Sequence, residues 1–393
     1  MAKKLLAFLE KETSNLHDAG LYRKEDTIRS AQEERVTIRS RKLINLASNN
    51  YLGFANHPEL KAAAKQAIDE YGVGVASPRV VGGTQTIHVR LERALAAFLR
   101  TEDALICPSR YHANTGLFES LLGERDFIFC DAFCHPSLAD GVRLSRARVL
   151  LYRNNDLNHL EDRLRRSRAA RFRIIVTDGV FSLDGVHADL AGICALASKF
   201  NAVVVVDDSQ GIGVMGANGR GTAEQLGVMS KVDVVTGTFG HALGGTGGYV
   251  SGRRQIVSWL RQKSRPCLVS NALDPGSVGG ALRALGLLEE ATGPLERLQA
   301  NVVFFRDALM SLGFRVIEGT HPIVAVLVGD AVSAQRMVDK LHSRNIYSMG
   351  FCYPVVPEGE ARIRVQITAQ LERQTLDRVV RAFESAGKKL GLI

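Results

Sequence analysis

Acidic side chains follow an apolar run in the middle of the chain. Residues 203–206 are four valines, and Asp207 and Asp208 come directly after them. An aspartate at the end of such a buried strand could pair with the positively charged ring nitrogen of a bound cofactor, which would let the ring draw electrons from a substrate. The same residue could instead cap the segment that follows.

A second candidate segment runs from Cys107 to Asn114 and joins an apolar run to a helical pattern. Backbone N–H groups at the start of a helix bind phosphate well, so Ser109, Arg110 and Tyr111 are candidate phosphate-binding residues. Tyr111 could also lie against an aromatic ring. A plain turn with a serine cap would give the same pattern.

Three further loops follow apolar runs and carry one polar candidate each. His135 could stack on a ring, although a lone histidine is more often a polar loop residue. Ser182 could donate a hydrogen bond to a phenolic oxygen, and Thr238 could hold a phosphate. The loop that begins with Thr238 continues through His241 to Gly248 and is rich in glycine.

The elements that position these residues alternate between short apolar strands and helices. This alternation predicts an α/β fold with a mostly parallel sheet and helices on both faces, and ligands bind at the carboxyl ends of such strands. We expect an N-terminal helix and arm over 1–55, a large α/β domain over 56–280, and a linking helix with a small α+β domain over 281–393. The expected strands are 104–107, 127–130, 149–152, 174–177, 202–207, 232–235, 314–317, 321–328 and 361–365, and the expected late helices are 331–344 and 372–390.

Composition and charge exclude some classes of protein. The chain has 393 residues, 46% of them hydrophobic and 23% charged, as in ordinary globular proteins. No apolar run approaches the length of a membrane span, the N-terminus is typical of an amphipathic helix, and six scattered cysteines predict a reduced, cytoplasmic protein without a metal site.

The net charge of +9 comes partly from arginines between Glu161 and Arg173. This segment fits a solvated helix end, or a docking patch for coenzyme A phosphates or an acyl carrier protein. Nucleic acid is disfavoured because no aromatic residues alternate with the arginines.

Taken together, the motifs resemble the α-oxoamine synthase family of fold-type I pyridoxal phosphate (PLP) enzymes, which are aminotransferase-like. The resemblance covers essentially the whole chain. It depends on segments 49–53, 83–84, 177–182, 207–209, 219–222, 264–266, 270–271, 351–357 and 362–364, together with the His135 loop.

The resemblance implies a homodimer with active sites at the subunit interface, and a reaction between an acyl thioester and an amino acid. It implies that Asp208 meets the pyridine nitrogen, His135 stacks on the ring and Ser182 approaches the ring oxygen. Phosphate would be held by the 109–111 amides, by Thr238 and by Ser270 from the partner subunit. Asn50 and Arg364 would bind the carboxylate of the amino acid.

Several positions depart from the family pattern. The Schiff-base lysine is replaced by His241, and the histidine after the double aspartate is replaced by Gln210. A small residue is replaced by Arg110, and Cys134 stands where asparagine is usual, while His112 follows the aromatic residue. Imidazole cannot form an imine with an aldehyde, so the usual covalent link to PLP is lost.

Three functions remain open at this point. In the favoured one, His241 is the general base of an acyltransferase that needs no covalent cofactor, transferring an acyl group from coenzyme A or a carrier protein to a small amine or amino acid. In the second, PLP or pyridoxamine phosphate is held without a covalent bond, with Gln210 and Arg110 among its contacts. In the third, the chain is an inactive paralogue that binds ligands or another protein.

Overall fold

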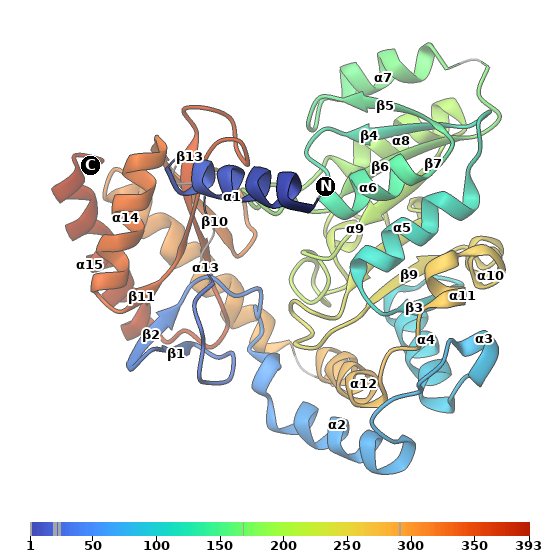
Figure 1. The fold of residues 1–393 in the computed structure, drawn as a ribbon, viewed down its shortest axis with the longest axis horizontal. Coiled ribbons are helices and arrows are strands. Elements are labelled where there is room, and N and C mark those ends of the chain that lie inside the picture. The colour runs from blue at the N-terminus through green and yellow to red at the C-terminus, as the bar shows by residue number, and fades with distance from the viewer. Residues whose placement is uncertain (1, 19–21, 23–24, 168, 291) are drawn as a thin grey trace.

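The computed structural model describes residues 2–18, 22, 25–167, 169–290 and 292–393. A seven-stranded sheet forms the centre of the larger lobe (Figure 1), in the order β3-β9-β8-β7-β6-β4-β5. Its strands are β3 (Asp103–Cys107), β4 (Phe127–Asp131), β5 (Arg148–Tyr152), β6 (Arg173–Asp178), β7 (Val203–Asp207), β8 (Val234–Thr238) and β9 (Gly248–Gly252). Strands β4 to β8 pair in parallel, which confirms the predicted mostly parallel sheet.

Strand β9 is antiparallel to both of its neighbours and was not predicted. Its sequence, Gly-Tyr-Val-Ser-Gly, has glycine at both ends and too few apolar residues to give a strand pattern. Close packing explains the first glycine, because a Cβ on Gly248 would lie 2.3 Å from the backbone carbon of Ser109. Gly248 therefore lets β9 approach the start of α5.

Alternating side chains of the strands pack on two opposite faces of the sheet. Val205 and Val176 join the core that contains α5 (Arg110–Leu121), α6 (Pro136–Leu144) and α10 (Arg254–Lys263). Val204 and Val206 join the core on the other face, which contains α4 (Thr86–Leu99), α8 (Leu190–Phe200) and α12 (Pro275–Glu290). Apolar burial on both faces explains the continuous valine runs of the central strands. The remaining elements of this lobe are η1 (Phe54–Asn56), α2 (Pro58–Tyr71), α3 (Arg79–Gly82), α7 (Leu157–Arg165), α9 (Thr222–Gln225), η2 (Met229–Lys231) and α11 (Arg265–Val269).

The smaller lobe contains two three-stranded sheets (Figure 1). One is formed by β10 (Ile323–Gly329), β13 (Ala361–Gln366) and β12 (Met349–Phe351), and the other by β1 (Arg35–Ile38), β2 (Arg41–Asn45) and β11 (Ile346–Tyr347). Its helices are α13 (Gly293–Ser311), α14 (Ala331–Ser343) and α15 (Arg373–Leu390). The predicted strand over 314–317 is wrong, because this segment makes a single bridge from Val316 to Val326 and does not extend into a ladder.

The N-terminal helix α1 (Ala2–Asp18) has no buried residue in the single chain. In Figure 1 it extends from the small lobe toward the large one. Its apolar side chains, among them Leu5 (59% exposed) and Phe8 (58% exposed), remain uncovered. None of the helices in the described ranges is long and apolar enough to cross a membrane.

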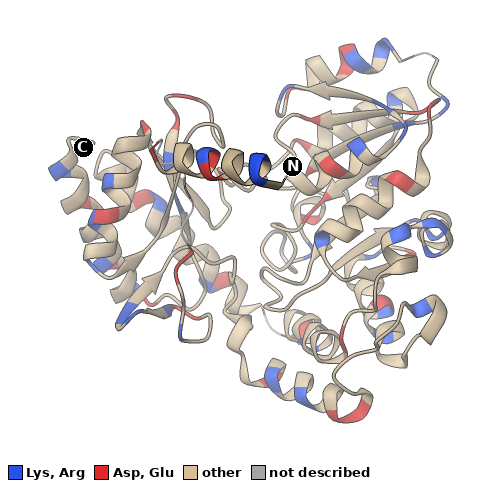
Figure 2. Cartoon of the chain, in the orientation of Figure 1, with Lys and Arg blue, Asp and Glu red and all other residues tan. Residues whose placement is uncertain are grey.

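The basic segment after α7 is extensively ion paired. Figure 2 shows acidic and basic residues interspersed along α7. Arg165 pairs with Glu161, Arg166 with Asp162, and Arg171 with the buried Asp126 at 2.6 Å. Arg168 lies outside the described residues. These pairs favour a solvated helix end over the docking patch that the sequence also allowed.

Asp208 directly follows β7, and glycines pack closely around its carboxylate. Its two carboxylate oxygens accept hydrogen bonds from the backbone N–H and the hydroxyl of Thr222, both at 2.6 Å. Burial raises the pKa of Asp208 to about 6. A Cβ on Gly221 would lie 1.9 Å from one of its oxygens, and Gly221 has a left-handed φ of +103°. This placement gives Asp208 a structural role and does not support the predicted contact with a pyridine nitrogen.

We expect Asp208→Ala to lower the free energy of unfolding by about 1–3 kcal/mol, because it leaves two buried donors of Thr222 without an acceptor. Asp208→Asn should recover most of this loss, since the amide oxygen can accept from the Thr222 N–H while its nitrogen donates to the hydroxyl. Urea unfolding followed by circular dichroism measures both, with Asp18→Ala, at the exposed end of α1, as control. Equal unfolding midpoints for Asp208→Ala and the control would show that this carboxylate does not stabilise the fold.

Candidate active site

Two buried carboxylates lie side by side where the central strands end. Asp178 is the last residue of β6 and Asp207 the last residue of β7, and the two are register partners in the parallel pair. Both are about 2% exposed or less. Two such carboxylates repel each other when both are ionised, so this edge of the sheet requires a cation.

Arg110, the first residue of α5, supplies that cation. Its Nε donates to Asp207 at 2.6 Å and its Nη2 donates to Asp178 at 2.9 Å. The side chain of Arg110 is 11% exposed. Burial works against the charged guanidinium, but the two carboxylates outweigh it and raise the pKa of Arg110. Arg110 therefore places a fixed positive charge at the strand ends.

Asp207 is saturated with donors from the chain itself. One oxygen accepts from Arg110 and from Asn114 at 2.7 Å, and the other accepts from the backbone N–H and the hydroxyl of Ser209 at 3.0 and 2.6 Å. Burial raises the pKa of Asp207, but Arg110 and these hydrogen bonds together lower it below the ordinary value. For Asp178, burial dominates over Arg110 and raises the pKa. Of this pair, Asp207 is thus the acid that favours the ionised form.

The positive charge of Arg110 affects both His241 and His135. Burial, followed by Arg110, lowers the pKa of each imidazole to about 4, so both are neutral at pH 7. The Nδ1 of His241 lies 2.9 Å from the carbonyl oxygen of Ser209. A carbonyl can only accept, so this nitrogen carries the proton and Nε2 is left as a free base.

His135 takes the opposite tautomer. It caps α6, and its Nδ1 accepts from the backbone N–H of Ser137 at 3.2 Å, while its own backbone N–H donates to Asp178 at 2.7 Å. The proton of the neutral ring therefore lies on Nε2. The site thus holds one imidazole that accepts a proton and one that donates a hydrogen bond.

Gln210 is held by residues from two distant segments. Its side-chain oxygen accepts from the hydroxyl of the fully buried Tyr51 at 2.8 Å. Its carbonyl lies 2.9 Å from the Nε2 of His321, whose Nδ1 accepts from the backbone N–H of Ile323. The glutamine therefore fixes the backbone next to Ser209, which in turn orients His241.

Arg364 on β13 keeps donors available. One of its terminal nitrogens donates to the carbonyl of Ser182 at 2.9 Å, and its guanidinium lies 4.6 Å from the Phe351 ring centroid. Its Nε is buried and has no hydrogen-bond partner among the described residues. By contrast, Asn50 is committed to the backbone, since its side chain accepts from Ala55 and donates to the carbonyl of Gln32. Of the two predicted carboxylate ligands, the geometry favours Arg364.

The hydroxyls of Ser109, Tyr111 and Thr238, at the predicted phosphate contacts, make local hydrogen bonds, and these bonds do not involve the backbone N–H groups of 109–111. Ser109 caps α5 by accepting from the backbone N–H of His112. The hydroxyl of Tyr111 donates to Asp140 on α6 at 3.0 Å, and its side chain is half exposed. Thr238 donates to the carbonyl of Gly247 at 2.9 Å. These contacts hold the loops around Arg110 in place.

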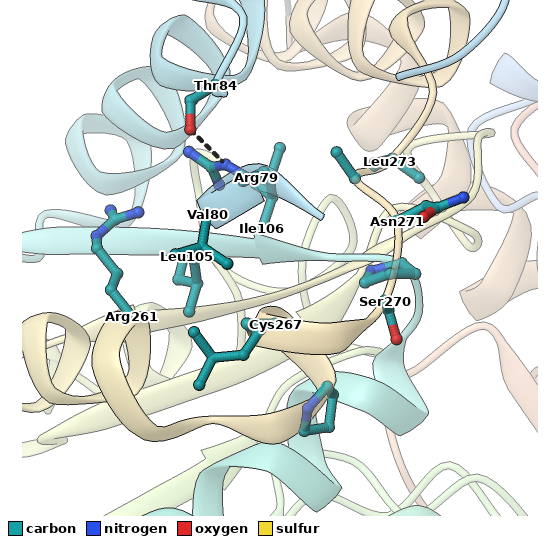
Figure 3. Close-up of a pocket in the computed structure, with 14 residues that line it drawn as sticks. Arg79, Val80, Thr84, Leu105, Ile106, Arg261, Cys267, Ser270, Asn271 and Leu273 are labelled. Carbon is teal, nitrogen blue, oxygen red and sulfur yellow. Dashed lines mark hydrogen bonds between the residues drawn. The ribbon is translucent and has the colours of Figure 1, made fainter. Parts of the chain in front are cut away.

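Ser270 lines a separate cavity of about 210 Å³ at the end of α11. Figure 3 shows it beside Asn271, with Arg79 and Arg261 on the far side of the cavity. Both arginines are anchored by the buried Glu92. The cavity opens beside Pro108, two residues before Arg110.

Sequence reasoning missed five residues of the site: Asp178, Asp207 as the acid, Asn114, Tyr51 and His321. The two acids carried a signal, because each ends a predicted strand. Asn114 and His321 carried none, since a buried polar residue in a helix or before a strand looks ordinary until its partners are known.

Comparison with known proteins identifies the family of the chain. Residues 41–383 match the family model described as aminotransferase class I and II. The chain is 47% identical to the 2-amino-3-ketobutyrate coenzyme A ligase of Escherichia coli, over 98% of this chain and 99% of that protein. It is 40% identical to the 8-amino-7-oxononanoate synthase of Thermoanaerobacter pseudethanolicus, over 99% of this chain and 98% of the relative.

A solved structure agrees with these relatives. The serine palmitoyltransferase of S. paucimobilis with a bound PLP–myriocin aldimine matches at a TM-score of 0.93 and 30% identity, over 98% of each chain. The resemblance inferred from the sequence motifs is confirmed: the chain belongs to the class I and II aminotransferase family, among the α-oxoamine synthases.

Proposed function

We propose that the chain is an acyltransferase that moves an acyl group from a thioester to a small amine or amino acid without a Schiff base. The thioester would be an acyl coenzyme A or an acyl carrier protein. One observation carries the proposal: the Arg110 guanidinium binds both strand-end carboxylates next to an imidazole at position 241. The relatives, whose names include a coenzyme A ligase, support the acyl-transfer class.

The residues present do not fit PLP held in the family manner. Position 241 offers imidazole, which cannot form an imine. Asp207 accepts four hydrogen bonds from the chain, so a ring nitrogen would have to displace Arg110 or Asn114. The same competition disfavours non-covalent pyridoxamine phosphate. The proposed reaction therefore uses the side chains of the protein alone.

The reaction needs a base, a donor for the carbonyl oxygen and a place for the acceptor. The acceptor's carboxylate would bind the free donors of Arg364, and its amine would face the Nε2 of His241. As the neutral amine attacks the thioester carbonyl, His241 takes the one proton that the nitrogen loses. The Nε2–H of His135 and the guanidinium of Arg110 face the negative charge that develops on oxygen.

Breakdown of the tetrahedral intermediate completes the step. The carbon–sulfur bond breaks, and the thiolate takes the proton back from the His241 imidazolium. The products are an amide and a free thiol, and no redox equivalent is consumed. Arg110 has five N–H groups, of which two bind the carboxylates in the described structure, so others remain for a substrate oxygen.

A homodimer is part of the proposal. Besides α1, the chain leaves apolar side chains exposed around the Ser270 cavity: Val80 (66% exposed), Val81 (76%) and Val269 (72%). Contiguous exposed apolar surface of this kind usually marks an interface. Ser270 would then contribute to the site of the partner subunit, as the family resemblance implies.

We expect His241→Ala to lower turnover by roughly 10²–10⁴-fold while thioester binding stays nearly intact, because only the base is removed. The wild-type rate should fall only as pH drops toward about 4, where the lowered pKa of His241 brings on protonation. Steady-state kinetics of thiol release measure both. His342→Ala, on α14, is the control. Equal rates for wild type and His241→Ala would remove the main support for the proposal.

A lysine at position 241 tests whether Arg110 and a PLP ring nitrogen compete for Asp207. Because Arg110 holds Asp207, His241→Lys alone should take up little PLP, whereas His241→Lys combined with Arg110→Ala should form a borohydride-reducible adduct at position 241. Wild type should give none. Peptide mass spectrometry and visible absorbance report the adduct. Equal uptake by the single and double variants would show that Arg110 does not obstruct the ring.

We expect light scattering at micromolar concentration to give twice the 42.8 kDa of one chain. Val80→Asp together with Val81→Asp should yield monomers, because charges in an apolar interface are costly to desolvate. Val332→Asp on α14, an equally accessible valine at 59% exposure, should leave the dimer intact. A monomeric wild type would contradict the proposed assembly.

A further inference from the structure

Two cysteines from different elements lie in contact next to the Ser270 cavity. Cys107 is the last residue of β3 and is buried, whereas Cys267 belongs to α11 and lines the cavity. Their Sγ atoms are 3.6 Å apart, and both thiols are free. Figure 3 shows Cys267 between Leu105 of β3 and Ser270.

The surroundings make the two thiols unequal. The hydrogen bond from Cys107 lowers the pKa of Cys267 to about 7, assisted by Ser264 and by the charge of Arg79, although burial opposes this. The same contact, followed by burial, raises the pKa of Cys107. Cys267 lines the cavity while Cys107 is buried, so Cys267 is the thiol favoured to ionise to the nucleophilic thiolate, with Cys107 as its donor.

We propose that Cys267 is an oxidation-sensitive nucleophile, reached through the cavity, and that Cys107 resolves its oxidised form into a disulfide. The oxidant we assign is hydrogen peroxide, which is small enough to enter the cavity. Nothing in this inference depends on the acyl-transfer reaction.

The chemistry balances in two steps. The Cys267 thiolate attacks one peroxide oxygen, the O–O bond breaks, and Cys267 becomes a sulfenic acid while hydroxide leaves and is protonated to water. The Cys107 thiol then attacks that sulfur, a second water leaves, and the S–S bond forms. Overall, two thiols are oxidised and one peroxide is reduced to two waters.

Closing the bond would pull α11 toward the sheet, because the sulfur atoms must approach from 3.6 Å to about 2.0 Å. The start of α11 packs closely against α5. A Cβ on Gly116 of α5 would lie 2.2 Å from the hydroxyl of Ser264, the residue before α11. The disulfide would fix α11, which ends beside Ser270, to β3, which ends three residues before Arg110. Oxidation would thus tie together two segments that border the site.

Other thiols of the chain serve as internal controls. Cys130 and Cys134 also lie near each other, but their Sγ atoms donate to the carbonyls of Asp131 and Val176. Burial raises the pKa of Cys134, so it stays a thiol. Cys352, on the other lobe, provides a cysteine outside both clusters.

The test uses the full-length, reduced protein and hydrogen peroxide. Peptide mapping by mass spectrometry should find a Cys107–Cys267 crosslink, which a reductant reverses. The midpoint temperature of thermal unfolding should rise by roughly several degrees, because the crosslink constrains the unfolded chain. Cys107→Ser should instead accumulate a sulfenic acid at Cys267 that dimedone traps. Cys267→Ser should give neither product, and Cys352→Ser should behave as wild type.

Two results would overturn the proposal. One is a wild-type protein in which Cys267 reacts with iodoacetamide at pH 7 no faster than Cys352. The other is a Cys107→Ser variant that remains folded by circular dichroism but shows no dimedone adduct at Cys267. Crosslinks between other cysteines in place of this pair would contradict it equally.

Discussion

The guanidinium of Arg110 between Asp178 and Asp207 is the interaction on which the site depends. Parallel strands bring the two carboxylates to the same edge of the sheet, and burial removes the water that would screen them. Breaking a buried ion pair by removing one partner typically costs about 3–5 kcal/mol, because the remaining charge is uncompensated. In this chain that edge of the sheet meets a side chain of the same polypeptide.

The chemistry of the histidines follows from that cation. Its charge adds to burial in keeping His135 and His241 neutral, and the backbone decides which nitrogen of each ring carries the proton. The outcome is a base and a donor near one positive charge. Gln210 belongs to the same arrangement, because Tyr51 and His321 hold it and thereby hold Ser209, to which His241 is bonded. Arg110, Gln210 and His241 are thus structurally linked.

Much of this could be predicted from the sequence, since strand ends are marked by apolar runs that stop at polar residues. The mostly parallel sheet was predicted correctly, and the histidine at position 241 can be read directly from the sequence. The choice between Asp207 and Asp208 was not predictable, because adjacent residues of a strand point to opposite sides and only the Thr222 contact shows where Asp208 points. Nor could the sequence reveal that Arg110 reaches two strands, or that β9 is a strand, since both depend on packing between distant segments.

Native mass spectrometry of the purified protein, combined with an absorbance spectrum, tests the central claim most directly. We predict a mass equal to two unmodified chains, no visible absorbance band, and turnover of an acyl thioester with an amino acid acceptor in buffer free of cofactor. A stoichiometric pyridoxal or pyridoxamine phosphate that survives dialysis would contradict the account, because Asp207 would then bind a ring nitrogen in place of Arg110.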